Sequence, residues 1–484
     1  MSPIHIPAIQ LSAIAPEIIL TCTAALLLMM EVFAEKKGKD HLGYVALAGV
    51  ALAGYATIGL HGPAHPAFSG LYVVDNFSTF FKVVFLIGTG LSILLSVKYI
   101  KDEGIDSGEY YAMLLFATVG MFTLASAANL ITVFMGVEVL SISLYVLAGY
   151  TRARETSNEA SIKYFILGAL SSGFLLYGIA LVYGATGTTG LHAIGDAVRA
   201  GVGNKMTLTV GAALITLGFC FKVAAAPFHM WTPDVYQGAP SPVTAFMSAG
   251  PKAAAFAAFL RVFAEAFPGL KGEWWEIIWI LAAVTMTLGN VVALQQNNVK
   301  RMLAYSSISH AGYVLVGFAA GSPAASSSIL FYMLAYTFMN IAAFAIVTGI
   351  GGKGEEKVYF QDYTGLGYSR PAVGLALSVA LFSLAGIPPT AGFAGKFYVF
   401  LSAIDEGFIW LAVIGVLNSV VSVFYYLRLT VYMYMREEGK AEATPAFAPS
   451  LVVATAVAVT GALWLGIAPG PYIEMAKAAF LTFQ

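Results

Sequence analysis

Apolar stretches long enough to cross a lipid bilayer follow one another along most of this chain. A bilayer core needs about 20 apolar residues in one helix, and this template predicts fourteen membrane-spanning helices, which makes the chain an all-α polytopic membrane protein. The spans are expected near residues 13–33, 41–61, 79–99, 110–126, 129–150, 161–184, 207–230, 241–263, 274–295, 302–320, 326–351, 371–402, 408–435 and 449–470.

Basic residues are distributed unevenly between the connecting loops. The loops after even-numbered spans and the C-terminal tail carry only Arg199, Lys205, Lys271 and Lys477. The loops after odd-numbered spans carry fourteen: Lys36, Lys37, Lys39, Lys98, Lys101, Arg152, Arg154, Lys300, Arg301, Lys353, Lys357, Arg370, Arg436 and Lys440. Because cytoplasmic loops are enriched in Lys and Arg, fourteen spans with both termini outside are predicted. No Lys or Arg precedes Lys36, so 13–33 is expected to be a retained span rather than a signal peptide.

Two spans are interrupted by proline. The seventh breaks at Ala226-Pro227, and the overlong twelfth breaks within "AGIPPTAGFAGK", residues 385–396. Such breaks persist in membranes where protein or a water-filled cavity covers the freed backbone groups. The breaks lie five spans apart, so the two spans run antiparallel, as in the inverted repeats of ion-coupled transporters.

We therefore expect four segments. Residues 1–109 contain helices 1–3, and residues 110–263 form a first five-helix repeat. Residues 274–435 form the second repeat, and residues 449–484 contain the last helix with a short tail.

Composition supports the membrane class and excludes several others. Hydrophobic residues make up 59% of the 484 residues and charged residues only 11%, whereas soluble domains carry about a quarter charged residues. A net charge of −1 excludes a strongly basic nucleic-acid binder. Two cysteines are too few for an iron–sulfur cluster, and no Walker A, HExxH or Ser/His/Asp pattern occurs. "GIGGKG", residues 349–354, follows a membrane helix and is interpreted as a loop.

Charged residues nevertheless occur inside the spans. Glu138 and Lys252 are expected near the bilayer midplane, where a charge costs roughly 2.5–3.5 kcal/mol unless it is paired or hydrated. The other basic residues within spans are Lys82, Lys163, Lys222, Arg261, Lys396 and Arg428.

Each of these residues has a structural alternative. Lys82, Arg261 and Arg428 lie near span ends, so their side chains are expected to reach the membrane–water interface. For Lys163, a side chain that reaches the interface and a buried side chain are equally consistent with the sequence. The deeper charges are consistent with structural ion pairs. His229 is as consistent with a cap of the broken seventh helix as with a path, and His310 is as consistent with a bond to a neighbouring helix.

The functional interpretation is a proton path. Burial lowers the pKa of a lysine and a nearby carboxylate raises it, so a switchable pair can load and release protons. The residues proposed for this role are Glu138, Lys222, Lys252 and Lys396, with Lys163, His229 and His310 as further candidates.

Five motifs resemble the antiporter-like membrane subunits of proton-pumping NADH:quinone oxidoreductase, respiratory complex I. They are "MGVEVLSISLYVLAGY", "EASIKYFILGALSSGFLLYG", "FKVAAAPFHMWTPDVYQGAPSPVTAFMSAGPKAAAFAAFLR", "NVKRMLAYSSISHAGY" and "LAGIPPTAGFAGKFYVF", and the resemblance covers about residues 70–435. Within that family the chain is most similar to subunits of type N. Lys396 stands where type M typically has Glu, and the short tail differs from the long lateral helix of type L.

The resemblance implies a role for each residue. Glu138 matches the glutamate thought to pair with the seventh-span lysine, Lys222, and Lys252 matches the eighth-span lysine of the path. Lys396 matches the terminal group. His229, His310 and Lys163 match further path residues of the family.

The resemblance also implies an activity and partners. The chain is expected to translocate protons in the bacterial cytoplasmic (inner) membrane, with both termini periplasmic, while other subunits carry FMN, Fe–S clusters and quinone. No cofactor or metal is expected on this chain, and no nucleic acid is expected as a partner. The main alternative is an Mrp-type Na⁺(K⁺)/H⁺ antiporter subunit. A solute transporter that acts alone is a further alternative.

Overall fold

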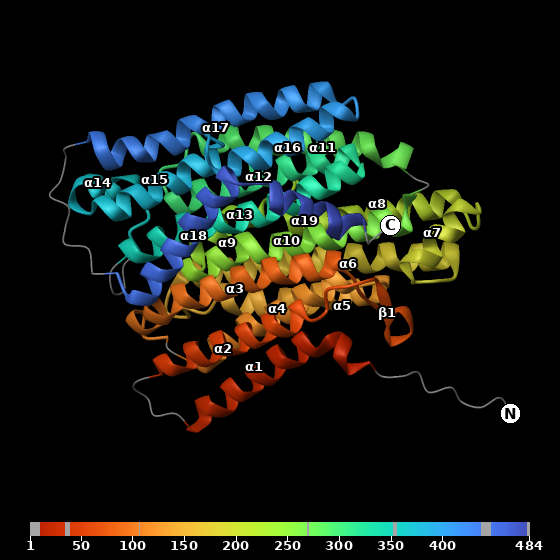
Figure 1. The fold of residues 1–484 in the computed structure, drawn as a ribbon, viewed down its shortest axis with the longest axis horizontal. Helices are drawn as coiled ribbons and strands as arrows, with labels where there is room; N and C mark the ends of the chain where they lie inside the picture. Colours follow the sequence, from red (N-terminus) through yellow and green to blue (C-terminus); the bar gives the residue numbers. More distant parts are fainter. Residues whose placement is uncertain are drawn as a thin grey trace.

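The computed structural model of this chain describes residues 10–33, 39–105, 107–268, 271–351, 356–436 and 447–481. Within these residues, thirteen helices are long and apolar enough to cross a membrane. The broken pair α15 and α16 supplies a fourteenth crossing, so the predicted all-α membrane architecture is confirmed (Figure 1). Four residues of the charge-bias prediction, Lys36, Lys37, Lys353 and Lys440, lie outside the described residues, as do residues 352–354 of the "GIGGKG" loop.

The described residues are mostly helical. The α-helices are α1 (Ala15–Phe33), α2 (Asp40–Ile58), α3 (Asn76–Asp102), α4 (Gly108–Ser126), α5 (Leu130–Ala148), α6 (Glu155–Thr186), α7 (Leu191–Arg199), α8 (Lys205–Val223), α9 (Trp231–Gly238), α10 (Ser241–Ala266), α11 (Lys271–Ala293), α12 (Val299–Ala320), α13 (Pro323–Ile350), α14 (Leu366–Ser369), α15 (Pro371–Ala385), α16 (Ala391–Asp405), α17 (Ile409–Met435), α18 (Pro449–Ile467) and α19 (Gly470–Leu481). Strands β1 (His65–Ala67) and β2 (Tyr72–Val74) form an antiparallel hairpin in which Pro66 pairs with Val73. Short 3₁₀ helices cover Leu11–Ile14, Phe68–Gly70 and Phe360–Tyr363.

Helices α10, α12 and α13 form the centre of the bundle. In each of them 94% of the most apolar window is buried, against 39% in α2, α6, α11, α17 and α18. The outer helices present apolar side chains outward, as expected for a lipid-facing surface. Polar groups placed on the three central helices are therefore enclosed by protein.

Small residues bring neighbouring helices close together. A Cβ atom added to Gly120 on α4 would lie 3.0 Å from the Gly136 carbonyl oxygen on α5. One added to Gly178 on α6 would lie 2.8 Å from the Gly211 carbonyl on α8. Membrane helices associate through such close backbone contacts because lipid provides no hydrophobic driving force between them.

Both predicted breaks are present. Helix α8 ends at Val223, and Ala224 adopts a left-handed conformation with φ of 62°. Helix α15 ends at Ala385, where Gly386 takes φ of 87° at no steric cost. Each connection contains a cis proline peptide, Ala226-Pro227 in the first and Pro388-Pro389 in the second.

Several local expectations were wrong. The segment after the first break, expected to be a connection, forms helix α9, and the expected short tail forms helix α19. Helix α6 begins at Glu155, about two turns before the expected start, and α7 and the β1–β2 hairpin were not predicted. All of these segments are short or partly polar, so the 20-residue apolar template could not detect them.

The loops after α3, α5, α11 and α13 meet at one end of the bundle, which we call the basic end. Arg154, in the loop after α5, pairs with Glu103 after α3 at 2.7 Å and with Glu356 after α13 at 3.5 Å. Lys300, which follows the α11–α12 loop, pairs with Glu356 at 2.9 Å. Helix α14 lies toward this end, whereas α7 and the hairpin lie at the other (Figure 1).

Candidate functional site: a row of lysines inside the bundle

Lys222 lies in the last turn of α8, beside the middle of α5. Its Nζ donates a hydrogen bond to the hydroxyl of Ser141 at 2.8 Å. Glu138 lies one turn before Ser141 at the centre of α5, so both side chains occupy the same face of that helix. The Glu138 charge acts on Lys222, yet the two side chains form no ion pair within the described residues. The Glu138 Oε1 atom is buried without a hydrogen-bond partner.

His229 lies in the connection between α8 and α9, and its Nδ1 atom is also buried without a partner. The break beside it is held by Trp231, whose indole Nε1 donates to the Phe221 carbonyl at 3.0 Å. This bond satisfies one carbonyl that the end of α8 leaves free.

Lys252 lies near the middle of α10 and is 2% exposed. Its Nζ donates to the Ser307 carbonyl on α12 at 3.0 Å and to the Ser307 hydroxyl. The ammonium also lies 5.8 Å from the centre of the Tyr236 ring, where a cation–π contact is favourable. The ion-pair alternative for Lys252 is not realised among the described residues, because its partners are neutral.

His310 follows Ser307 by one turn on α12 and is held by two tyrosines. Its Nδ1 forms a hydrogen bond with the Tyr332 hydroxyl at 2.6 Å, and its Nε2 forms one with the Tyr426 hydroxyl at 3.2 Å. The charges of Lys252 and Lys396 both act on the imidazole. The His310 ring centre also lies 5.5 Å from that of Tyr313, whose ring faces the Lys396 ammonium, so His310 lies between the two lysines.

Beyond His310 the polar groups continue toward Lys396. The Tyr425 and Tyr426 rings lie 4.4 Å apart, and the Tyr425 hydroxyl donates to Asn290 Oδ1 at 2.9 Å. The Asn290 amide donates in turn to the Tyr313 hydroxyl at 3.2 Å. The Lys396 ammonium lies 4.7 Å from the centre of the Tyr313 ring.

Lys396 is placed on α16 and closes the break in its own span. Its Nζ donates to the carbonyls of Leu384 and Ala385 at 3.0 and 2.9 Å, and to the Ser419 hydroxyl at 2.9 Å. The carbonyl end of α15 carries a partial negative charge, which a cation stabilises. The free carbonyls at the two breaks are therefore bound by different groups, the Trp231 indole at the end of α8 and the Lys396 ammonium at the end of α15.

Lys163 stands apart from this row. It is 41% exposed and pairs with Glu159 and with Asp234 on α9, each at 2.6 Å. Asp234 is shared with Arg301 of α12 at 2.7 Å. These contacts link α6, α9 and α12, and no described contact joins Lys163 to Lys222 or Lys252.

Further polar atoms along the row are buried without a hydrogen-bond partner. They are Thr232 Oγ1, the hydroxyls of Tyr236 and Tyr336, and both amide atoms of Asn340. Such atoms in a protein interior are usually satisfied by protein or by water. The Tyr236 ring lies beside Lys252 and the Tyr336 ring lies beside His310, so these two hydroxyls belong to the same polar region.

Sequence reasoning missed two buried ion pairs. Lys82 and Arg261 were expected to reach the interface, but each is 1% exposed. Lys82 pairs with Glu17 of α1 at 2.8 Å, and Arg261 pairs with Asp75 at 2.8 Å. The acidic Glu17 within the first apolar stretch was the available signal. Arg428 bonds the loop after α11 through Asn297 at 2.6 Å.

Among the described residues no group of three or more His, Cys, Asp or Glu side chains could hold a metal ion.

Comparison with known proteins gives the family. The family model described as "NADH:quinone oxidoreductase/Mrp antiporter, TM" matches residues 127–422. NADH-quinone oxidoreductase subunit N of Trichlorobacter lovleyi is 52% identical over 97% of this chain and 97% of its own length.

Solved structures agree with this result. A chain of respiratory complex I from Thermus thermophilus with bound aureothin is 36% identical, with a TM-score of 0.82 over 96% of this chain and all of its own. A chain of the Mrp complex from a Dietzia species has a TM-score of 0.86 over 98% of this chain and 97% of its own, but at 22% identity it shows the fold alone. The chain therefore belongs to the NADH:quinone oxidoreductase/Mrp antiporter membrane family and, within it, to the subunit N group of NADH-quinone oxidoreductase.

Proposed function

We propose that this chain translocates protons as a membrane subunit of an NADH:quinone oxidoreductase. The observation that carries the proposal is the row of lysines inside the bundle, in which Lys252 and Lys396 are buried and Lys222 is partly buried. His310 lies between the last two, one turn from the partner of Lys252 and in ring contact with Tyr313 beside Lys396. Ionisable groups inside a membrane protein are costly and mark ion or proton pathways. The similarity to subunit N of Trichlorobacter lovleyi agrees with this function.

The first step that we propose is a switch at Lys222. Its ammonium has a neutral acceptor, Ser141, and a nearby carboxylate, Glu138, whose Oε1 is unpartnered. A carboxylate favours the protonated lysine, whereas burial without one favours the neutral amine. Movement of Lys222 between the two partners would therefore load and release a proton.

The proton would then pass along the row. Released from Lys222, it would reach Lys252 through the buried polar groups near His229 and Tyr236. From Lys252 it would pass through His310 and the tyrosines to Lys396. Lys163 would act only indirectly, by positioning α9 through Asp234.

We propose that the two five-helix segments, residues 110–263 and 274–435, are inverted repeats. Each holds one broken helix, and each holds a helix pair brought together by glycine. In the first segment Gly120 and Gly136 join α4 to α5, and in the second Gly289 and Gly312 join α11 to α12. The helices before residue 110 would form a separate N-terminal segment.

Electron transfer is assigned to partner subunits. FMN, Fe–S clusters and quinone would be held there, and this chain would receive energy as a conformational or electrostatic change. We propose the bacterial cytoplasmic membrane as its location, with the basic end inside and both termini outside. The bias of Lys and Arg toward one set of loops supports this orientation.

The test uses the intact complex in sealed vesicles. Lys222→Ala and Glu138→Ala are expected to reduce proton translocation strongly during NADH oxidation, and Lys252→Ala is expected to do the same. Lys477→Ala, on the exposed face of α19, is the matched control and should pump normally. Near-wild-type pumping in Lys222→Ala and Glu138→Ala would refute the proposal.

The rival function is cation/proton antiport. It is supported by the shared family model and the common fold with the Mrp chain. An imposed Na⁺ or K⁺ gradient that drives proton movement through the complex without NADH would favour it.

A further inference from the structure

Lys300 is an enclosed cation that the proposed path does not yet use. It is the second residue of α12, and its side chain is fully buried. Its Nζ donates to the Ala239 carbonyl at 2.6 Å and to Glu356 Oε2 at 2.9 Å. Lys300 thus has one carboxylate and one neutral acceptor, whereas Lys222 contacts its neutral acceptor Ser141 and has its carboxylate only nearby.

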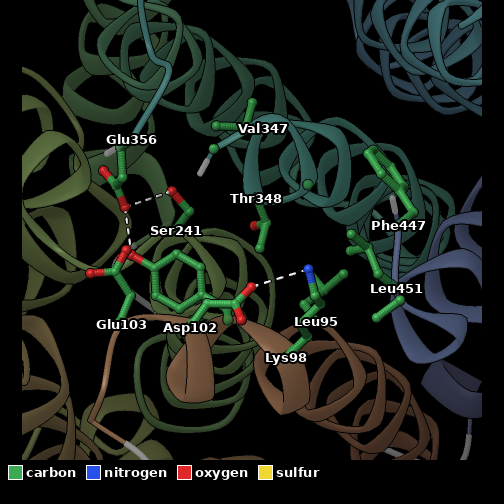
Figure 2. Close-up of a pocket in the computed structure, with 14 residues that line it drawn as sticks. Leu95, Lys98, Asp102, Glu103, Ser241, Val347, Thr348, Glu356, Phe447 and Leu451 are labelled. Atoms are coloured by element: carbon green, nitrogen blue, oxygen red, sulfur yellow. Dashed lines mark hydrogen bonds and ion pairs between the residues drawn. The ribbon is translucent and has the colours of Figure 1, made fainter. Parts of the chain in front are cut away.

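Glu356 has several competing partners at the basic end. It accepts from the Tyr99 hydroxyl at 2.6 Å and from the Ser241 hydroxyl at 3.1 Å (Figure 2). Arg154 lies 3.5 Å away and is also bound to Glu103. Glu356 can therefore exchange Lys300 for Arg154 as its main cation with a small movement.

Glu356 also lines a pocket that opens at this end of the bundle (Figure 2). Its side chain is 16% exposed, whereas that of Lys300 is fully enclosed. The pair thus joins a water-accessible carboxylate to an inaccessible ammonium. That arrangement suits a site that takes up a proton from the aqueous side.

Helix register connects this pair to Lys252. Lys300 precedes Ser307, the partner of Lys252, by seven residues, which is about two turns of α12. Ser241 precedes Lys252 by eleven residues, which is about three turns of α10. Both helices therefore carry the Glu356 cluster and the Lys252 site on one face.

We propose that Lys300, with Glu356 as its switchable partner, is a proton-loading site that supplies Lys252 from the basic end. When Glu356 moves toward Arg154, the Lys300 ammonium loses its carboxylate. Its proton then passes to the neutral amine of Lys252 along α10, where the Thr244 and Ser248 hydroxyls lie between the two sites. Lys300 is reprotonated from water at the basic end when Glu356 returns. The inference rests on the proposed function, because it assumes that Lys252 carries protons.

The decisive variant is Lys300→Arg. Arginine keeps the positive charge and can still bind Glu356, but it does not release its proton in proteins. In the intact complex in vesicles, we expect NADH-driven proton translocation to fall at least threefold. Electron transfer from NADH to a water-soluble acceptor should be unchanged and reports on assembly.

Lys98→Arg is the matched control, because Lys98 lines the same pocket and forms a half-exposed pair with Asp102 at 3.1 Å. It should pump normally. Normal pumping in Lys300→Arg would overturn the inference, and so would an equal loss in both variants. If Lys252→Ala still abolishes pumping in that case, the proposed function stands without this site.

A second variant tests the switch through its pH profile. Glu356→Gln removes the carboxylate that favours protonated Lys300, so pumping should decline at a lower pH than in the wild type. An unchanged pH profile would overturn the role of Glu356. The other titratable or charged groups that face the pair are Tyr99, Glu103, Arg154 and Tyr363, with Lys98 and Asp102 on the pocket wall.

Discussion

The Nζ atom of Lys222 donates to the Ser141 hydroxyl at 2.8 Å, one turn of α5 away from an unpartnered carboxylate oxygen. Lys222 thus lies close to its expected partner, Glu138, but its hydrogen bond goes to Ser141 instead. The three lysines of the row differ in this respect. Lys222 has one hydrogen-bond acceptor, Lys252 has two atoms of Ser307, and Lys396 has three acceptors.

Ser141→Ala tests the neutral state of Lys222. Without the hydroxyl, the ammonium is expected to bind Glu138 more persistently and to release its proton more slowly. Proton translocation during NADH oxidation should fall severalfold, but less than in Lys222→Ala. Ser143→Ala is the control, because within the described residues the Ser143 hydroxyl bonds only the Val139 carbonyl of its own helix. Equal pumping by both serine variants would contradict this prediction.

Asp75→Asn tests the buried pair with Arg261. The side chain of Asp75 also caps α3 by accepting from the Ser78 amide at 2.7 Å, and asparagine retains that cap. Only the charge is lost, so the buried guanidinium keeps Glu265 at 3.3 Å but loses the carboxylate that it contacts at 2.8 Å. We expect the free energy of unfolding in detergent to fall by about 3–5 kcal/mol.

The control for this pair is Glu474→Gln. Its ion pair with Lys477 is exposed, so its loss should cost no more than about 1 kcal/mol. A similar cost in Asp75→Asn and Glu474→Gln would show that the Asp75 pair contributes little.

Gly392→Ala tests how closely the two halves of the twelfth span must approach. A Cβ atom at residue 392 would lie 1.7 Å from the Ser383 carbonyl oxygen, so α15 and α16 must separate. Overpacking of this kind typically costs about 1–3 kcal/mol, and we expect reduced thermal stability together with reduced pumping. Gly173→Ala on α6 meets no atom within 4 Å and should change stability by less than about 1 kcal/mol. A stable, fully active Gly392→Ala protein would refute this account.

The Glu356 cluster predicts a pH dependence of stability. Burial alone would raise the pKa of the Glu356 carboxyl, but Lys300, Arg154 and the Tyr99 hydroxyl together hold that pKa below its usual range. A lowered carboxyl pKa contributes stability that is present above the unfolded value of about 4.3 and is lost as the pH falls through the folded value. The difference in unfolding midpoint between wild type and Glu356→Gln should therefore shrink from neutral pH to below about pH 4. A constant difference would contradict the ion-pair account.

Sequence reasoning predicted the fold more fully than the site. Span number and both breaks follow from apolar length and proline, which are local properties. Lys252 and His310 are both buried, at 2% exposure each, whereas the depth predicted for Lys252 in the membrane stays a prediction. The partners of these residues could not be predicted. Ser307, Tyr332 and Tyr426 carry no special signal in the sequence, and only the packing of the helices brings them to Lys252 and His310.

Lys300 and Lys82 are buried although the sequence did not predict it. Lys300 adjoins Arg301 at a span end, so it counted as a loop charge, yet packing of the basic end encloses it completely. Lys82 and Glu17 lie on helices whose contact cannot be inferred from either segment alone. Whether a side chain near a span end is buried depends on the loops and helices that pack around it. The apolar pattern of its own span does not show those neighbours.

The three acceptors of Lys396 have a consequence for how proton movement is felt by the protein. An ammonium group has three N–H donors, and here all three are used, two of them on the carbonyl end of α15. A neutral amine has two N–H bonds and one lone pair, so loss of the proton removes one donated contact. The Ser419 hydroxyl can donate to that lone pair in return, but the two carbonyls cannot. If the lost contact is to Leu384 or Ala385, the end of α15 is held less firmly whenever Lys396 is neutral. Lys396 would then hold the end of α15 in place only while it carries its proton.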